Sequence, residues 1–200
     1  PDLNEQERLD FFRFYAEYVN GRVELLAGTG CIRYADTLAL SNAVYELGYT
    51  PMVISPYYFE MDQEKLFVYY DRLAKDVKGD LYLYNFPPRT GHSIAPETIR
   101  RLIDANPNII GLKDSVSIPG HTNMVCRAVE GKPFTVYSGF DDQFLSNIAN
   151  NGGGGCIGAL SIIVPEIWSS LVKAANEKDF DRTFALYHLI QKLMPIYDMD

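Results

Sequence analysis

The sequence has few of the residues on which disulfide-bonded, metal-binding and membrane-spanning proteins depend. Its 200 residues include three cysteines and three histidines, and no two cysteines form a Cys-x-x-Cys pair. This composition predicts reduced thiols in a cytoplasmic protein, with no metal site. No apolar run approaches the roughly 18 residues of a transmembrane helix, and no signal peptide opens the chain. We therefore expect no membrane association.

Basic residues are also scarce. The chain has 18 lysines and arginines against 26 acidic residues, which gives a formal net charge of −8. Nucleic-acid binding needs clustered positive charge, so this balance argues against a nucleic-acid partner. The hydrophobic share of 47% is far too high for a disordered chain and suits a packed core.

Short apolar runs alternate with helical patterns along the whole chain. The apolar character of each predicted strand indicates burial on both faces, which is typical of a parallel sheet. The repeat of about 30 residues has the length of a βα unit. No linker divides the chain, so we predict a single α/β domain over residues 1–200. The predicted strands are 23–27, 52–54, 81–84, 109–113, 134–137 and 156–160. The predicted helices are 8–19, 34–47, 62–75, 96–104, 121–129, 142–149, 165–176 and 179–193.

Two parallel architectures fit this pattern, the doubly wound sheet and the (β/α)₈ barrel. A dinucleotide-binding sheet needs Gly-x-Gly-x-x-Gly after its first strand, but Gly28 and Gly30 are followed by Arg33 at the third glycine position. A barrel instead carries polar residues at the carboxyl ends of several strands. The chain has such residues at Thr29, Ser55, Tyr84, Lys113 and Ser138. The pattern therefore favours the barrel over a nucleotide-binding domain.

Lys113 is the strongest candidate for chemistry because it closes the apolar run Ile109–Leu112. Burial disfavours the charged form of a lysine, and a neutral amine can attack a ketone to form a Schiff base. The alternative is a strand-end lysine that pairs with Asp114 or reaches out to solvent. Tyr84 ends the preceding predicted strand and would lie beside Lys113, where a phenol can shuttle protons. Taken alone, Tyr84 would be interpreted as an aromatic lid residue, and only its position beside Lys113 favours the catalytic role.

Two loops could hold an anionic ligand. Arg89 lies between prolines and a glycine after the same strand as Tyr84, where a guanidinium suits a carboxylate; the alternative is a surface arginine. Gly152–Gly155 would let the backbone closely approach a small ligand or a phosphate, although no P-loop pattern accompanies it.

Several motifs together resemble the pyruvate-dependent class I aldolases, the family of dihydrodipicolinate synthase, N-acetylneuraminate lyase and the 2-keto-3-deoxy sugar acid aldolases. The most specific are YNFPPRTG at 84–91 and NIIGLKDS at 108–115. AGTG at 27–30, SPYY at 55–58, YSGFDD at 137–142 and GGGCIG at 153–158 match in the same order, so the resemblance covers nearly the whole chain.

The resemblance implies a (β/α)₈ TIM barrel, usually a homotetramer built from dimers, without metal or organic cofactor. Lys113 would form the Schiff base with pyruvate and Tyr84 would shuttle protons. Ile157 would offer a backbone contact to the pyruvate moiety, and Gly139 would border the second substrate. Tyr58 would complete a proton relay in the site of a neighbouring subunit.

The resemblance leaves the aldehyde partner open. Arg89 is similar to the arginine with which the synthases hold a semialdehyde carboxylate. It favours 4-hydroxy-tetrahydrodipicolinate (dihydrodipicolinate) synthase, which condenses pyruvate with aspartate semialdehyde in lysine biosynthesis. Phe140-Asp141-Asp142 is closer to the lyases, in which a carboxylate such as Asp141 would hold sugar hydroxyls, and Lys113-Asp114 is closer to the sugar acid aldolases. Ala159 stands where a sialic acid lyase would place serine, so N-acetylneuraminate lyase is the weaker of these alternatives.

The chain departs from the family pattern at its start. Family members begin with two further βα units, and the loop after the second strand holds the substrate carboxylate. The sequence starts at Pro1, on the helix that follows that loop. We therefore expect about six of the eight βα units, followed by the start of a C-terminal helical extension. A non-catalytic barrel fragment that binds a small acid or a partner subunit is the remaining alternative.

Overall fold

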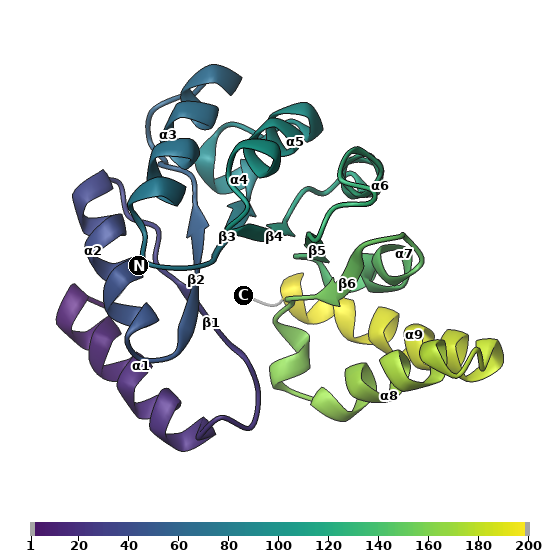
Figure 1. Ribbon diagram of the computed structural model, residues 1–200. Helices are drawn as coiled ribbons and strands as arrows, with labels where there is room; N and C mark the ends of the chain where they lie inside the picture. The colour runs from purple at the N-terminus through teal and green to yellow at the C-terminus, as the bar shows by residue number, and fades with distance from the viewer. Residues whose placement is uncertain (1–2, 199–200) are drawn as a thin grey trace.

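Six parallel strands form one sheet in strict sequence order in the computed structural model, which describes residues 3–198. The strands lie in an inner arc with helices around its convex side (Figure 1). An uninterrupted order keeps right-handed crossovers on one face, whereas a doubly wound sheet reverses its strand order. The predicted alternation of strands and helices is therefore confirmed, as six units of a barrel-type wall. The strands are β1 (Leu25–Gly28), β2 (Tyr49–Ile54), β3 (Leu81–Asn85), β4 (Ile109–Asp114), β5 (Thr135–Ser138) and β6 (Gly153–Cys156).

The helices follow the strands with the expected spacing. Within residues 3–198, no helix combines the length and the apolar character needed to cross a membrane. The α-helices are α1 (Glu5–Val19), α2 (Tyr34–Tyr45), α3 (Gln63–Asp76), α4 (Pro87–Thr90), α5 (Pro96–Ala105), α6 (Pro119–Ala128), α7 (Phe144–Ile148), α8 (Pro165–Asn176) and α9 (Phe180–Leu193). Short 3₁₀ segments are η1 (Asp141–Gln143), η2 (Leu160–Ile162) and η3 (Met194–Asp198).

Capping residues start three of the helices. The helices α3 and α9 begin within one residue of the predicted starts, whereas α1 begins at Glu5, three residues before the predicted range. Asn4 and Glu7 form a reciprocal capping box at α1, Asp62 accepts the Lys65 N–H at α3, and Asp179 accepts the Arg182 N–H at α9. These side chains satisfy amide groups that the first helical turn leaves without a partner.

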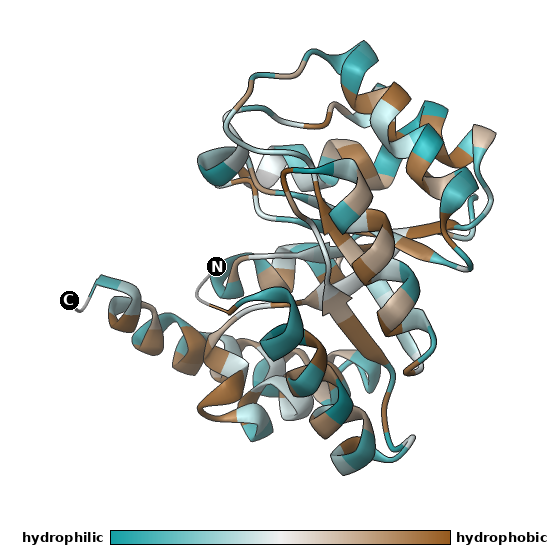
Figure 2. Ribbon diagram, turned by 90° about the vertical axis from the view of Figure 1, so that its left-hand side faces the viewer, coloured by the Kyte–Doolittle hydropathy of each residue, from teal (hydrophilic) through white to brown (hydrophobic). Residues whose placement is uncertain are grey.

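The main core lies between the strands and the helices on the convex side. Leu83 and Leu112 are fully buried in it and belong to one cluster with side chains of α3, α5 and α6. The helices in Figure 2 accordingly carry hydrophobic stripes. Because side chains alternate along a strand, Tyr84 and Lys113, the next residues after these leucines, lie on the concave face.

A register shift between β3 and β4 decides which side chain lies opposite Tyr84. Leu81 pairs with Ile109, but Tyr82 pairs with Gly111, so one residue of β4 is extra and Tyr84 lies opposite Lys113. A side chain at Gly111 would collide with the Tyr82 ring, since an added Cβ would lie 2.1 Å from Tyr82 Cε1. Glycine therefore permits this close approach of the two strands.

The last strand differs from the sequence prediction. We expected a strand at 156–160 and a ligand-binding loop at Gly152–Gly155, but β6 spans Gly153–Cys156. An added Cβ would lie 1.9 Å from the Asn147 carbonyl oxygen at Gly153 and 2.3 Å from Thr135 at Gly154, and Gly155 has φ +119°. The glycines are thus required by tight packing against α7 and β5, and the prediction of a glycine loop for a ligand or phosphate was wrong.

The core position of β4 yields a stability test. Leu112 is fully buried, so Leu112→Ala should lower the free energy of unfolding by about 2–5 kcal/mol through lost burial and a residual cavity. Leu189→Ala, at a leucine of α9 that is 43% exposed, should cost much less. Urea denaturation of both variants measures this; equal losses would contradict the assigned core.

Candidate active site

Tyr84 and Lys113 lie side by side at the carboxyl ends of β3 and β4. They are direct partners in the parallel ladder, and the Lys113 Nζ lies over the Tyr84 ring, 4.5 Å from its centroid. Both side chains are partly buried. The strand pairing therefore places an amine against an aromatic face at one edge of the sheet, as the sequence predicts.

An aromatic stack connects this pair to Arg89. The Tyr84 and Phe86 rings stack with centroids 5.6 Å apart and an interplanar angle of 20°. The Arg89 guanidinium lies 6.0 Å from the Phe86 centroid. Arg89 is carried by the single turn of α4, which Gly91 ends in the left-handed conformation. The guanidinium is thus held on the same side of the sheet as Lys113.

One cavity of about 640 Å³ collects most of the predicted site residues. Its wall includes Tyr84, Arg89, Lys113, Gly139 and Ile157. A volume of this size suits a small organic ligand. The cavity therefore offers an amine, a guanidinium and an aromatic face to one small molecule.

Gly139 and Ile157 enter the cavity wall through the backbone. The Gly139 N–H donates to the Asp114 carbonyl and the Ile157 N–H donates to the Ser138 carbonyl. Since both N–H groups are already used, a backbone contact from Ile157 to a ligand would have to come from its carbonyl oxygen. A Cβ at Gly139 would lie 1.8 Å from Ser115 Oγ, so glycine keeps this part of the wall close to β4.

Asp141 does not line the cavity, although we expected it to hold substrate hydroxyls. It is fully buried, and its Oδ2 accepts hydrogen bonds from the Tyr197 hydroxyl and the Ala159 N–H. Burial and the bond to Asp141 raise the pKa of Tyr197 to about 12. The neighbouring Asp142 lines the cavity instead. The 3₁₀ turn at η1 directs the Asp141 carboxylate inward, toward η3. The sequence pattern does not reveal this orientation.

Tyr58 also lies away from this cavity wall. It follows β2 with φ +82°, and its exposed fraction is 86%. Its ring contacts Phe59 edge to face, and Phe59 is also exposed. An exposed aromatic pair on a strained turn is compatible with a contact to another molecule, and the relay role of Tyr58 stays a prediction.

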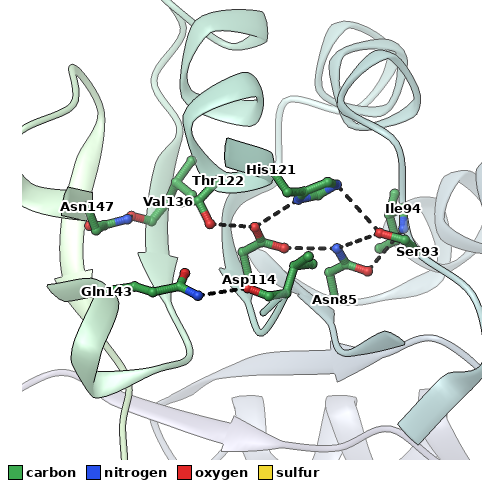
Figure 3. A network of polar contacts seen from close by, with 10 residues as sticks. Asn85, Ser93, Ile94, Asp114, His121, Thr122, Val136, Gln143 and Asn147 are labelled. Atoms are coloured by element: carbon green, nitrogen blue, oxygen red, sulfur yellow. Dashed lines mark hydrogen bonds and ion pairs between the residues drawn. The ribbon is translucent and has the colours of Figure 1, made fainter. Parts of the chain in front are cut away.

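A buried polar network joins Asn85 and Asp114, the residues that follow Tyr84 and Lys113, to the start of α6 (Figure 3). Asn85 Nδ2 donates to Asp114 Oδ1 at 2.9 Å. Asp114 Oδ2 accepts from Thr122 Oγ1 at 2.7 Å and from His121 Nδ1 at 2.9 Å. Ser93 Oγ contacts both Asn85 and His121. Every oxygen of the buried Asp114 carboxylate is therefore hydrogen-bonded.

This network changes the ionisation of His121. Burial lowers the pKa of His121, but the hydrogen bond to Asp114 and the charge of that carboxylate outweigh burial, so the net pKa is raised. The protonated imidazole is thus favoured beside Asp114.

The cysteine thiols, in contrast to the His121 imidazole, are favoured in their uncharged form. Cys31, Cys126 and Cys156 are all free. Burial raises the pKa of Cys126 to about 11 and that of Cys156 to about 12, so both are protonated near neutral pH and are poor nucleophiles. Among residues 3–198, no three histidine, cysteine or acidic side chains group as a potential metal site.

Several cavity residues were not singled out by the sequence analysis. Ser115, Ser117, Phe86 and Asp142 line the cavity, as does Tyr197 from the far end of the chain. The first four belong to the quoted motifs or adjoin them, so their position next to a strand end was an available signal. Tyr197 follows a helical segment without any motif, and nothing in the pattern indicates its return to the site.

Comparison with known proteins gives a consistent picture. The sequence-family model described as "Dihydrodipicolinate synthetase family" matches residues 1–199. A putative 2-dehydro-3-deoxy-D-gluconate aldolase, YagE of Escherichia coli K12, is 32% identical over 99% of the chain and 66% of its own length. A 4-hydroxy-tetrahydrodipicolinate synthase of Kosmotoga olearia is 34% identical over 98% of the chain and 66% of its own length. The chain thus spans just under two thirds of the length of these relatives.

Solved structures agree with the observed fold. The crystal structure of YagE in complex with pyruvate has a TM-score of 0.94 at 31% identity, and covers 99% of this chain and 67% of its own. Dihydrodipicolinate synthase from Aquifex aeolicus has a TM-score of 0.92 at 26% identity, over 100% of this chain and 68% of its own. Both kinds of relative therefore share the backbone arrangement that carries the Tyr84–Lys113 pair.

The His121–Asp114 contact predicts a pH-dependent contribution to stability. A raised pKa in the folded protein stabilises the fold below the unfolded pKa of about 6.5, and this stabilisation is lost as the pH rises through the folded value. His121→Gln keeps a donor but cannot titrate. The stability difference between wild type and variant, from urea unfolding, should shrink from about pH 6 upward. A difference that grows with pH would contradict the assignment.

Proposed function

Because the chain belongs to the dihydrodipicolinate synthetase family, we propose that its cavity binds pyruvate covalently on Lys113 and makes or breaks a carbon–carbon bond to an aldehyde. The position of the Lys113 amine over the Tyr84 ring, inside a cavity of suitable size, carries this proposal. Because the chain spans only part of the length of its relatives, the activity is proposed for the protein in which these residues occur.

The chemistry follows from the groups in the cavity. The Lys113 amine adds to the C2 carbonyl of pyruvate, and loss of water gives the imine. Loss of a C3 proton turns the imine into an enamine, which attacks the aldehyde carbon; hydrolysis of the product imine then returns the amine. Each step moves a proton, and the phenol of Tyr84, the residue paired with Lys113 on the adjacent strand, can carry it. No metal or organic cofactor is invoked in these steps.

Arg89 favours an aldehyde that carries a carboxylate. Its guanidinium lines the Lys113 cavity and can pair with a carboxylate through two hydrogen bonds. Aspartate semialdehyde has this character, and relatives such as the Kosmotoga olearia protein are 4-hydroxy-tetrahydrodipicolinate synthases. We therefore propose a dihydrodipicolinate synthase activity, a step of lysine biosynthesis, as the first candidate.

Asp142 supports a second candidate, a 2-keto-3-deoxy sugar acid aldolase. Its carboxylate lines the same cavity and could accept hydrogen bonds from substrate hydroxyls, the role that we had expected of Asp141. YagE, and a probable 2-dehydro-3-deoxy-D-pentonate aldolase of Escherichia coli K12 that is 31% identical, are named for such substrates.

The exposed Tyr58 supports an oligomer, a homotetramer or a dimer. Tyr58 and its neighbour Phe59 expose 86% and 67% of their surface, an unfavourable arrangement for two adjacent aromatics unless they meet another surface. We propose that Tyr58 enters the site of a neighbouring subunit and extends its proton relay.

The free thiols are compatible with the cytoplasm.

Trapping tests the covalent step. Incubation of the full natural protein with pyruvate and borohydride should reduce the imine and leave a stable adduct on Lys113, which peptide mass spectrometry can locate. Lys113→Ala should abolish the adduct, whereas Lys173→Ala, at an exposed lysine of α8, should retain it. Wild-type protein without an adduct would favour the non-catalytic alternative.

A substrate panel separates the two candidates. If the synthase proposal holds, Arg89→Ala should lower kcat/KM for aspartate semialdehyde about tenfold or more, the effect of losing a charge-assisted hydrogen bond of about 1.5–3 kcal/mol, with little change in imine formation. Arg101→Ala, on the outer surface of α5, is the matched control.

The second candidate, a sugar acid aldolase, predicts a different outcome. Asp142→Asn would then reduce cleavage of 2-keto-3-deoxygluconate, while wild-type protein would show no condensation with aspartate semialdehyde.

A further inference from the structure

The two proposed catalytic residues are each followed by a residue that points to the other face of the sheet. Asn85 follows Tyr84 and Asp114 follows Lys113, and the register pairs Tyr84 with Lys113 and Asn85 with Asp114. Asn85 and Asp114 are 1% and 0% exposed. The side-chain hydrogen bond between them, at 2.9 Å, thus joins β3 and β4 at the level of the catalytic pair.

Both members of this cross-link are fixed from outside the sheet. Asn85 Oδ1 accepts the Ile94 N–H at 3.0 Å, which orients the amide so that its NH₂ group faces Asp114. Asp114 Oδ2 accepts from Thr122 and His121 in the first turns of α6. These contacts converge on the carboxylate in Figure 3. The helix N-terminus also favours a negative charge at this point.

We propose that Asn85, Asp114 and Thr122 are positioning residues that hold the Tyr84 phenol against the Lys113 amine; this inference rests on the proposed function. They act through the backbone of β3 and β4 and touch no substrate. A small rotation of either strand end would move the ring relative to Nζ, and such displacements of reacting groups lower rates steeply.

The geometry distinguishes this role from general support of the fold. The strands are already joined at this level by a backbone bond, from the Ser115 N–H to the Asn85 carbonyl, so the cross-link is not needed to close the ladder. What it adds is a fixed side-chain contact between the two residues adjacent to the catalytic pair. Loss of this contact should therefore alter the chemical step more than substrate binding.

Asn85→Asp is the sharpest test because it keeps the size of the side chain and the acceptor for the Ile94 N–H. In its ionised form the new carboxylate replaces the donor to Asp114 with an acceptor, so the cross-link is lost. Asn106→Asp is a closely matched control, since Asn106 Nδ2 donates to the Asp71 carboxylate at 3.1 Å, near the start of β4 and away from the site. Both variants place a carboxylate against a carboxylate.

The readout is the rate of imine formation, measured by rapid mixing of the full natural protein with pyruvate and quenching with borohydride. At saturating pyruvate, Asn85→Asp should lower this rate about 100-fold, as expected for misplaced reacting groups. The pyruvate concentration at half-saturation should stay within about threefold, and Asn106→Asp should keep the wild-type rate. A folded Asn85→Asp with the wild-type rate, or an equal loss in both variants, overturns the proposal.

A second pair of variants decides the question if Asn85→Asp does not fold. Thr122→Val removes the hydroxyl that donates to Asp114 at nearly constant shape, and Thr122→Ser restores it. Thr122→Val should slow imine formation and Thr122→Ser should recover it; equal rates in the two overturn the proposal. Wild-type protein that forms no adduct overturns the proposed function and this inference together, whereas a normal adduct with insensitive variants overturns this inference alone.

Discussion

The register between β3 and β4 is the constraint on which the site depends. Because strand side chains alternate between faces, a slip of one residue would exchange the inner and outer faces of a strand. The extra residue of β4 near its start brings Lys113, and not Leu112, opposite Tyr84. Ile109 and Leu112 both lie in the core on the helix side, which a regular alternation would not permit. The irregularity therefore keeps apolar residues in the core while it sets the amine beside the phenol.

The two faces of the sheet consequently have different tasks. The concave face presents the amine, the aromatic stack and the guanidinium to a cavity. The opposite face contains the main core and the buried network around Asp114. A carboxylate buried in such a core is costly unless its oxygens are hydrogen-bonded, and here both are. The polar cluster thus belongs to the support of the site rather than to its ligand-facing surface.

The sequence was sufficient for much of the fold because local and global signals agree in most units. Asn4, Asp62 and Pro96 mark helix starts, and the runs around Leu83 and Leu112 mark buried strands. The prediction failed at β6 because glycine has little strand propensity. The preference of this segment comes from contacts with α7 and β5, which no local pattern expresses.

The site residues also divide into those that the sequence could predict and those that it could not. Lys113, Tyr84 and Arg89 could be grouped from strand spacing alone, because neighbouring parallel strands end at one edge. The orientation of Asp141 could not be predicted, since it depends on the turn at η1 and on Tyr197, a residue 56 positions away. Adjacent carboxylates in a short turn point in different directions, and sequence does not reveal which one faces the cavity.

The glycines of strand β6 affect how amino-acid substitutions can alter the cavity. Three of its four residues have no side chain with which to anchor themselves, so its path is dictated by the neighbouring Asn147 and Tyr137. The wall at Ile157–Ala159 continues directly from this strand. Substitutions on α7, remote from the amine, can therefore reshape the cavity wall at Ile157–Ala159 while the Tyr84–Lys113 pair stays in place. One part of the cavity wall can thus change shape independently of the strand pairing that places Tyr84 against Lys113.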